Sequence, residues 1–110
     1  MPNFSRHEVI LVRYPFTDLS GGKVRPAVII SPAHPSADLI VVPLTSRIAG
    51  LLAGEFPLGD WRAAGLNVPT AVKRGLYTVH DSLIVKSVGN LALADRARLE
   101  ASVRQWIGLF

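Results

Sequence analysis

The stretch Lys23-Val24-Arg25-Pro26-Ala27-Val28-Ile29-Ile30 places a fixed cation at the start of a buried strand. Residues 27–30 are small or β-branched, as a strand buried on both faces requires. Pro26 fixes its own φ and biases Arg25 toward extended backbone. The preceding Ser20-Gly21-Gly22 is typical of a flexible turn where backbone approaches a ligand closely. An arginine held in this way either grips a phosphate or carboxylate through bidentate hydrogen bonds, or caps the strand with a surface ion pair.

Length and composition predict one folded domain over residues 1–110. The chain is 49% hydrophobic and 18% charged, which is typical of a globular protein and not of a disordered one. A domain of this size buries roughly two-thirds of its unfolded surface, so one core can hold it without disulfides or metal. The chain has no cysteine, and His7, His34 and His80 show no metal-ligand spacing. We therefore expect no metal site and no cofactor.

Charge and hydropathy narrow the class of partner. Twelve Lys and Arg against eight Asp and Glu give a net charge of +4, which favours nucleic acid or an acidic protein segment. The N-terminus lacks the apolar core of a signal peptide, and no apolar run approaches the roughly 20 residues that span a bilayer. The sequence thus predicts a soluble, cytoplasmic protein with no membrane association.

Short hydrophobic runs separated by Gly- and Pro-rich turns predict many short β-strands. We expect strands over residues 8–14, 25–31, 39–44, 55–58, 70–74, 77–79 and 84–89. Pro43 inside the third run indicates a sheet edge, a bulge or the strand's end, because proline cannot donate to a ladder. Residues 60–64 could form one helical turn closed by Gly65.

The C-terminal segment has helical periodicity instead. Its apolar residues recur at i, i+4, i+7 and i+11: Leu99, Val103, Trp106 and Phe110. Asp95 early and Arg104 late suit the helix dipole, whereas the N-cap is weak, with Asn90 or Ala92 as candidates. Trp106 is expected in the core or a dimer seam. Many strands followed by one helix predict a mostly β (α+β) fold, a small twisted antiparallel sheet or SH3-like half-open barrel with short helices and a C-terminal helix.

Two neighbouring strands point to a site. Those over 25–31 and 39–44 are expected to pair, which would bring Arg25 and Thr45 to the same rim of the sheet. Ser46-Arg47 would add a hydroxyl and a second cation there. An arginine beside a threonine hydroxyl can clamp a phosphate, because the arginine neutralises charge and the hydroxyl fixes an oxygen. Alternatively, Thr45 is a turn residue that bonds its own backbone, and the spacing does not decide between the two.

Six motifs occur in a fixed order along nearly the whole chain. They are Tyr14-Pro15-Phe16-Thr17-Asp18 after the opening strand, Gly21-Gly22-Lys23-Val24-Arg25-Pro26, Val42-Pro43-Leu44-Thr45-Ser46, Pro69-Thr70-Ala71-Val72-Lys73, Val79-His80-Asp81, and a closing helix that ends in Ile107-Gly108-Leu109. The ordered set resembles the MazF/PemK family of toxin ribonucleases from type II toxin–antitoxin pairs. The resemblance implies a compact β-sheet fold related to the CcdB-like toxins, a homodimer and a cognate antitoxin.

The resemblance also implies an activity, namely sequence-specific, metal-independent cleavage of single-stranded RNA. In that reaction the 2′-hydroxyl attacks the adjacent phosphate and leaves a cyclic phosphate and a 5′-hydroxyl. The family's catalytic pair, an Arg before Pro and a Thr after the third strand, matches Arg25 and Thr45. Arg25 would stabilise the developing charge and is a poor base, since the pKa of arginine stays above about 12. Thr45 would orient the phosphate, and the sequence does not identify the base.

Further RNA contacts are expected where loops and strand ends flank the groove. Cations there would bind the backbone, and an aromatic ring would stack on a base. The candidates are Phe16, Thr17, Asp18, Gly22, Lys23, Ser46, Arg47, Lys73, Arg74 and Tyr77. For Lys73, Arg74 and Tyr77 the alternative is a solvated strand end with a half-buried ring.

The chain departs from the family pattern near residues 75–78. Many relatives carry an acidic and then a polar residue there, whereas this chain has Gly75, Leu76 and Thr78. His80 stands where relatives usually have an apolar residue, so we interpret it as a structural or exposed histidine and not as the base. Trp61 is interpreted as a packing residue.

The sequence leaves three functions open. The leading one is an endoribonuclease toxin that acts on mRNA as a dimer and is silenced by an antitoxin, whose acidic tail would compete with RNA for the basic groove. The second is a CcdB-like topoisomerase poison, to which the ending Trp106-Ile107-Gly108-Leu109-Phe110 bears a superficial likeness. Arg25-Pro26 and Leu44-Thr45-Ser46 favour the ribonuclease. The third is a catalytically weakened protein of the same fold that binds RNA or antitoxin without turnover, given Gly75 and Thr78.

Overall fold

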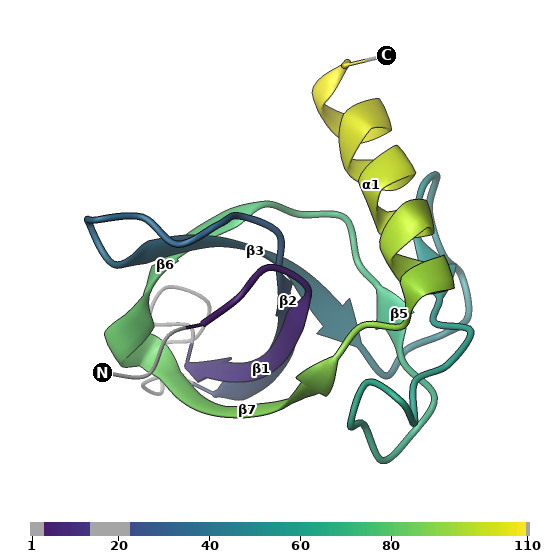
Figure 1. Ribbon diagram of the computed structural model, residues 1–110. Helices are drawn as coiled ribbons and strands as arrows, with labels where there is room; N and C mark the ends of the chain where they lie inside the picture. The colour runs from purple at the N-terminus through teal and green to yellow at the C-terminus, as the bar shows by residue number, and fades with distance from the viewer. Residues whose placement is uncertain (1–3, 14–22, 110) are drawn as a thin grey trace.

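The computed structural model describes residues 4–13 and 23–109 (Figure 1). Along these ranges the elements are β1 (Glu8–Arg13), β2 (Val24–Ile29), β3 (Asp38–Thr45), β4 (Phe56–Pro57), β5 (Ala71–Val72), β6 (Tyr77–His80), the 3₁₀ turn η1 (Asp81–Leu83), β7 (Ile84–Asn90) and α1 (Leu93–Ile107). Of the short helices expected from the sequence, this part of the chain contains only η1. None of its helical segments has the length and hydropathy to cross a bilayer.

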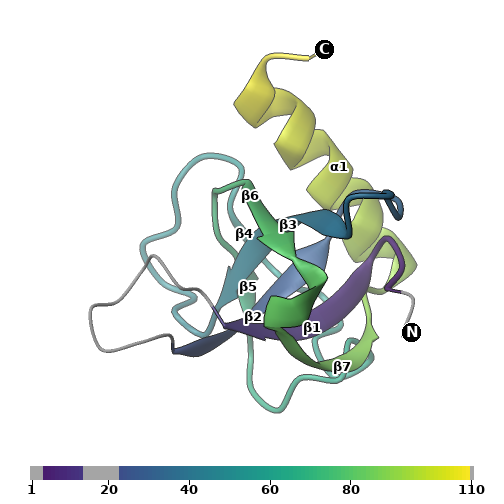
Figure 2. The same ribbon diagram turned by 90° about the vertical axis from the view of Figure 1, so that its left-hand side faces the viewer.

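The strands form one antiparallel sheet in the order β4-β5-β3-β2-β1-β7, with β6 also paired to β3. Strand β3 therefore shares one of its edges between two partners, β6 along its first half and β5 at its end. The sheet curls strongly, and η1 connects β6 to β7 across the open side (Figures 1 and 2). The predicted open, antiparallel, mostly β fold with a C-terminal helix is confirmed.

Alternating side chains of the central strands serve two cores. Ile10, Ile29 and Val41 are buried inside the curl of the sheet and form part of the inner core. Their chain neighbours Val28 and Val42 point the other way, into the outer core. This core also contains Phe56 and Val72, and Leu99 of α1 covers it. Because successive residues of a strand face opposite sides, a strand buried on both faces must be apolar throughout. This is why the run that ends β2 has no polar residue.

Several strand bounds differ from the expected ones. Strand β2 ends at Ile29 because the amide of Ile40 bonds the Ser31 hydroxyl (2.9 Å), where a backbone ladder would need a carbonyl. Strand β5 keeps only two of the five predicted residues; its partner β3 ends at Thr45, which leaves Thr70 without a partner in that strand. Strand β4 is also limited to two residues. Tyr14, the predicted end of the first strand, lies outside the described residues.

Pro43 occupies an interior strand, so the prediction of an edge, a bulge or a strand end is wrong. It pairs with Ala27 of β2, and β3 continues to Thr45. On the other side of β3, the pairs with β6 stop at Val41 and those with β5 start at Leu44. The proline therefore stands in the gap between two partners, where a ladder donor is not needed.

Helix α1 begins without a side-chain cap. Its N-cap is Ala92, and Asn90 belongs to β7, so the alternative cap is wrong. Asp95 in the first turn is 2% exposed, and its carboxylate accepts the amides of Gly59 (2.9 Å) and Asp60 (3.1 Å). Asp95 thus connects the turn at residues 59–60 to α1, and its negative charge also suits the dipole at the start of this helix.

Residues 59–65 form turns and not the expected helical turn, but Gly65 closes them with φ +84° as predicted. The Gly65 amide bonds the Arg62 carbonyl (3.0 Å), and a Cβ at Gly65 would overlap the carbonyl group of Val88 in β7. The turn therefore packs backbone against backbone on β7, which only glycine allows.

Replacing Gly65 with alanine should lower the free energy of unfolding by about 2–4 kcal/mol, from left-handed strain plus overlap with β7. The matched control is Gly108→Ala at the end of α1, where φ is +77° but nothing lies within 4 Å of the new Cβ. It should lose only about 1 kcal/mol. Urea titration measures both, and equal losses would contradict the close packing.

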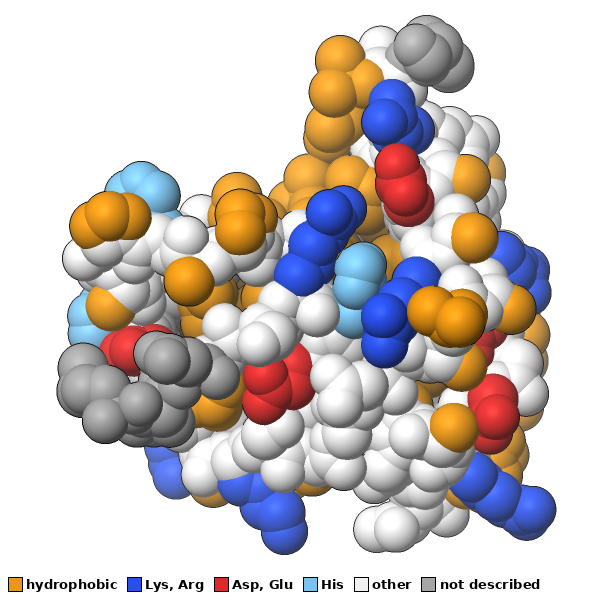
Figure 3. Space-filling view, in the orientation of Figure 1, with side chains coloured by type: hydrophobic (Ala, Val, Ile, Leu, Met, Phe, Trp, Pro, Cys, Tyr) orange, Lys and Arg blue, Asp and Glu red, His pale blue; other side chains and the backbone are white. Residues whose placement is uncertain are grey.

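His7 has a positive φ of 75° at the junction of β1, β2 and α1. Its amide bonds the Ile29 carbonyl (2.6 Å), and its carbonyl accepts the Leu91 amide (2.9 Å). Burial lowers the pKa of the imidazole, and Arg96 and Arg6 lower it further, against a smaller opposing effect of Glu100. Figure 3 shows basic side chains gathered around a histidine on this face, beside α1.

The lowered pKa of His7 should appear as a pH dependence of stability. Below pH 6.5, the ordinary pKa of an imidazole, the unfolded chain takes up more protons at this site than the folded one. Stability should therefore fall as pH falls from about 6.5 toward the lowered folded pKa. His7→Gly and His7→Asn, which tolerate this φ and do not titrate, should lack this contribution in urea titrations across the window. An unchanged slope in both variants would contradict the assignment.

Candidate active site

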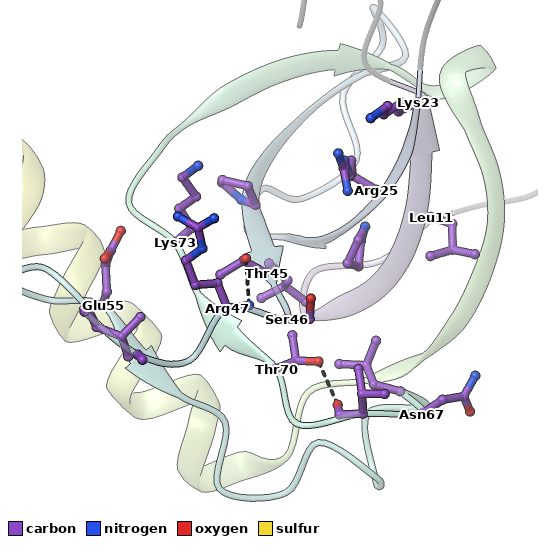
Figure 4. Close-up of a pocket in the computed structure, with 18 of the residues that line it drawn as sticks. Leu11, Lys23, Arg25, Thr45, Ser46, Arg47, Glu55, Asn67, Thr70 and Lys73 are labelled. Carbon is purple, nitrogen blue, oxygen red and sulfur yellow. Dashed lines mark hydrogen bonds between the residues drawn. The ribbon is translucent and has the colours of Figure 1, made fainter. Parts of the chain in front are cut away.

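The pairing of β2 with β3 brings the two predicted catalytic residues together. Ala27 lies opposite Pro43, and two residues further the same antiparallel register carries Arg25 to Thr45. Both side chains line one open cleft of about 1020 Å³ (Figure 4). The predicted pairing and the shared rim are thus present.

The cleft is lined with positive charge on two sides. Arg25 of β2 and Lys23, which directly precedes β2, approach from one side, and Arg47 and Lys73 approach from the opposite side, with Thr45 between them (Figure 4). Glu55 is the one carboxylate among the described lining residues. Apolar side chains such as Leu11 and Leu44, with two prolines, line the space between these charges. Such a surface suits a ligand that carries several negative charges and flat apolar groups.

Thr45 is the backbone-bonding turn residue of the second interpretation, and the phosphate clamp stays a prediction. Thr45 Oγ1 accepts the amide of Arg47 (3.1 Å), so it is a turn residue that bonds nearby backbone. Because the oxygen is used as an acceptor, the hydroxyl hydrogen remains available to donate to a ligand in the cleft. The turn also fixes the position of that hydroxyl relative to Arg47.

The Arg25 side chain is exposed and has no hydrogen bond or ion pair to any described residue. Its position depends on β2, where it pairs with Val12 of β1. An extended residue before proline at the end of a paired strand has little backbone freedom. The guanidinium therefore stands at the rim, and no described residue occupies its donors.

Glu55 was not among the site residues predicted from the sequence. Its Oε1 accepts the amide of Leu52 (2.7 Å) and its Oε2 that of Arg74 (2.8 Å). These bonds, Arg74 first, lower the pKa of the carboxyl. Burial opposes them with a smaller effect, and the charges of Lys73 and Arg74 add still smaller effects that lower the pKa. No spacing rule links Glu55 to a residue 19 positions later, so only the fold reveals the contact.

The other predicted RNA contacts divide into three groups. Those that line the cleft with Arg25 and Thr45 are Lys23, Ser46, Arg47, Lys73 and Tyr77. Arg74 does not line it, although its amide is bonded to Glu55. Phe16, Thr17, Asp18 and Gly22 lie outside the described residues. The cleft also has lining residues that were not predicted as site residues, among them Leu52, Asn67, Val68 and Thr70.

Tyr77 and Gly75 form one contact at the cleft. A Cβ at Gly75 would lie 3.0 Å from the Tyr77 ring and 3.2 Å from Pro43 Cγ. Tyr77 is half-buried and packs on the inner core, so its alternative interpretation also holds while the residue lines the cleft. Gly75 thus leaves room for this ring.

His80 is exposed and does not line the cleft. It pairs with Asp38, at the end of β3 remote from Thr45, and its Nδ1 accepts the amide of Ser82 (3.1 Å). The interpretation of a structural or exposed histidine is confirmed. In the described part of the chain, no group of three or more His, Asp or Glu could hold a metal ion.

Comparison with known families decides the class. The model of the family described as PemK-like, MazF-like toxin of type II toxin-antitoxin system matches residues 5–107. The chain belongs to this toxin family. No curated protein matches it. The order of motifs from the opening strand to the closing helix therefore reflects membership of the MazF-like toxins.

Solved MazF structures share the fold. The Mycobacterium tuberculosis toxin MazF-mt6 is 21% identical, with a TM-score of 0.74 over 94% of this chain and 98% of that one. A MazE-MazF structure from Deinococcus radiodurans is 16% identical, with a TM-score of 0.79 over 99% and 100%. An endoribonuclease in complex with its cognate antitoxin, from a mycobacterial species, is 14% identical, with a TM-score of 0.77 over 97% of each chain. At these identities the likeness concerns the fold alone.

Proposed function

We propose that this MazF-like toxin is a sequence-specific, metal-independent endoribonuclease that cuts single-stranded RNA. The observation that carries the proposal is the placement of Arg25 and Thr45 at one rim of a cleft lined by three further cations. Membership of the toxin family and the fold shared with structures of endoribonucleases support it.

The proposed reaction needs no water or metal. The 2′-oxygen loses its proton and bonds to phosphorus, the bond from phosphorus to the 5′-oxygen breaks, and that oxygen gains a proton. The products are a cyclic phosphate and a 5′-hydroxyl. Arg25 would neutralise the charge that builds on the phosphorane and donate to the leaving oxygen. Thr45 would donate its hydroxyl hydrogen to a phosphate oxygen, since its lone pair is engaged by the Arg47 amide.

None of the described residues in the cleft is assigned as the base. Glu55 uses both of its oxygens on backbone amides, and its lowered pKa makes it a weak proton acceptor. His80 lies outside the cleft. This favours, as a second candidate, a catalytically weakened toxin that binds RNA or antitoxin without turnover.

The topoisomerase poison has less support. Trp106, which carried the likeness to that class, is half-buried, and its Nε1 donates to the Ala53 carbonyl (3.0 Å). The ring is therefore engaged within the fold and not presented to a partner. Phe110, the other residue of the likeness, lies outside the described residues.

The proposed partners follow from charge and family. A cognate antitoxin with an acidic segment would occupy the basic cleft and exclude RNA from it. Solved structures with this fold include a MazE-MazF structure and an endoribonuclease in complex with its cognate antitoxin. We also propose a homodimer that works in the cytoplasm.

Replacing Arg25 with alanine should reduce RNA cleavage by at least about 100-fold, because one charged donor to the phosphorane is lost. Folding should be unaffected, since the side chain is exposed. The assay is incubation with long single-stranded RNA in EDTA, followed by mapping of ends and of cyclic phosphates.

The matched control is Arg104→Ala, which removes the same charge from the exposed face of α1. It should cut at the same motif as the wild type. Cleavage that survives in Arg25→Ala would remove Arg25 from the mechanism. A wild type that binds RNA but never cuts it would favour the weakened toxin.

A further inference from the structure

Glu55 closes a tight turn at the edge of the cleft. The Glu55 amide donates to the Leu52 carbonyl (2.9 Å), and the Leu52 amide donates back to Glu55 Oε1 (2.7 Å). Two reciprocal bonds over four residues fix the backbone of this turn, as in a capping box. The turn places Leu51 and Leu52 along the cleft.

Helix α1 holds the same turn from behind. Ser102 Oγ donates to the Gly54 carbonyl (2.7 Å), and Trp106 Nε1 donates to the Ala53 carbonyl (3.0 Å). Gly54 has φ +85°, and a Cβ there would overlap the Trp106 ring. The turn thus lies against the helix, and residues 52–55 are anchored on both sides.

The second oxygen of Glu55 reaches a different segment. Oε2 accepts the amide of Arg74 (2.8 Å), which follows Lys73 just beyond β5. Lys73 is also bonded through its own amide to the carbonyl of Pro43 (3.0 Å), two residues before Thr45. One carboxylate therefore links the anchored turn to the strand end that carries a cation into the cleft.

We propose that Glu55 is a positioning residue that sets the distance between these two segments and so fixes one wall of the cleft. The inference rests on the proposed function, because that wall is the one along which an RNA backbone would meet Lys73. Figure 4 shows Glu55 at the edge of the cleft, beyond Arg47 and Lys73 and away from Arg25. It acts on the substrate through these neighbours and not by contact with the reacting phosphate.

The charge state of Glu55 fits this role. Backbone bonds to an ionised carboxylate are stronger than neutral ones, and they stabilise the charged form. Lys73 and Arg74 lower the pKa of the carboxyl in the same sense. The link, meaning the two bonds from the Leu52 and Arg74 amides to the Glu55 carboxylate, is therefore complete at neutral pH. It is lost as pH falls through the lowered pKa of this carboxyl.

The first experiment tests the link in the free protein. In proton–nitrogen NMR spectra, the amide protons of Leu52 and Arg74 should titrate together, with one midpoint below 4.5, the ordinary pKa of a glutamate carboxyl. Glu55→Gln should abolish this shared transition, because its side-chain amide does not ionise and its NH₂ group cannot accept a backbone N–H. Glu100→Gln, a matched change at an exposed residue of α1, should preserve it. Independent titration of the two amides would overturn the link.

The second experiment tests its consequence for RNA. Glu55→Gln should raise KM for RNA cleavage about tenfold and leave kcat within about threefold, as expected for loss of a charge-assisted bond that orders a binding wall. Glu100→Gln should change neither. The melting temperature of Glu55→Gln should stay near that of the wild type, which separates positioning from global unfolding. Unchanged KM and kcat in a variant that has lost the shared titration would overturn the positioning role.

An inactive wild type would count against the proposed function and not against the link. Binding of RNA with a 2′-deoxy sugar at the cut site then replaces cleavage as the measurement. About tenfold weaker binding by Glu55→Gln would still support the positioning role. Equal binding by the two proteins, or no binding by the wild type, would overturn it.

Discussion

The pairing of β2 with β3 is the constraint on which the site depends. Its register, with Ala27 opposite Pro43, determines that Arg25 and Thr45 meet at one end of the sheet. A slip of one residue would turn every side chain of β3 to the other face. Such a slip would exchange the inner core, with Val41, for the outer core, with Val42. The apolar residues on both faces of the central strands therefore fix the register of β2 and β3. The two cores in this way determine the relative position of Arg25 and Thr45.

The cleft concentrates positive charge that the described residues of the fold do not neutralise. Lys23, Arg25, Arg47 and Lys73 face one space, with Glu55 as the single described carboxylate. Mutual repulsion of exposed cations is weakened by solvent and salt, so its cost to stability is small. A polyanion that displaces water from the cleft can accept hydrogen bonds from several of these cations at once. The one carboxylate does not cancel this field, because its oxygens are directed at backbone amides and away from the open space.

The sequence predicted the part of the site that depends on the pairing of two consecutive strands. It did not predict the contacts between segments that are distant in the chain. Arg25 and Thr45 could be paired in advance because their strands are adjacent, connected by a short turn and apolar in a pattern that fixes register. Glu55 could not be found, since its partner Arg74 lies 19 residues away and the contact exists only once β4 and β5 are paired. The position of Pro43 was misjudged for a related reason. A proline is excluded from a ladder only where a partner is present, and the gap between β5 and β6 is a property of the assembled sheet.

Helix α1 shows the same limit in another form. Its periodicity predicted a packing face, and Leu99 confirms it. The periodicity did not reveal that polar groups on this helix form bonds of their own with the chain between β3 and β5. Asp95 holds the amides of residues 59 and 60, Ser102 the carbonyl of Gly54, and Trp106 that of Ala53. These bonds join the helix to a segment that itself has little regular structure. Because loops that lack a ladder must satisfy their backbone groups elsewhere, the helix supplies the partners that a neighbouring strand would otherwise provide. The wall of the cleft is thus a loop whose shape is set by a helix on the opposite side from the substrate.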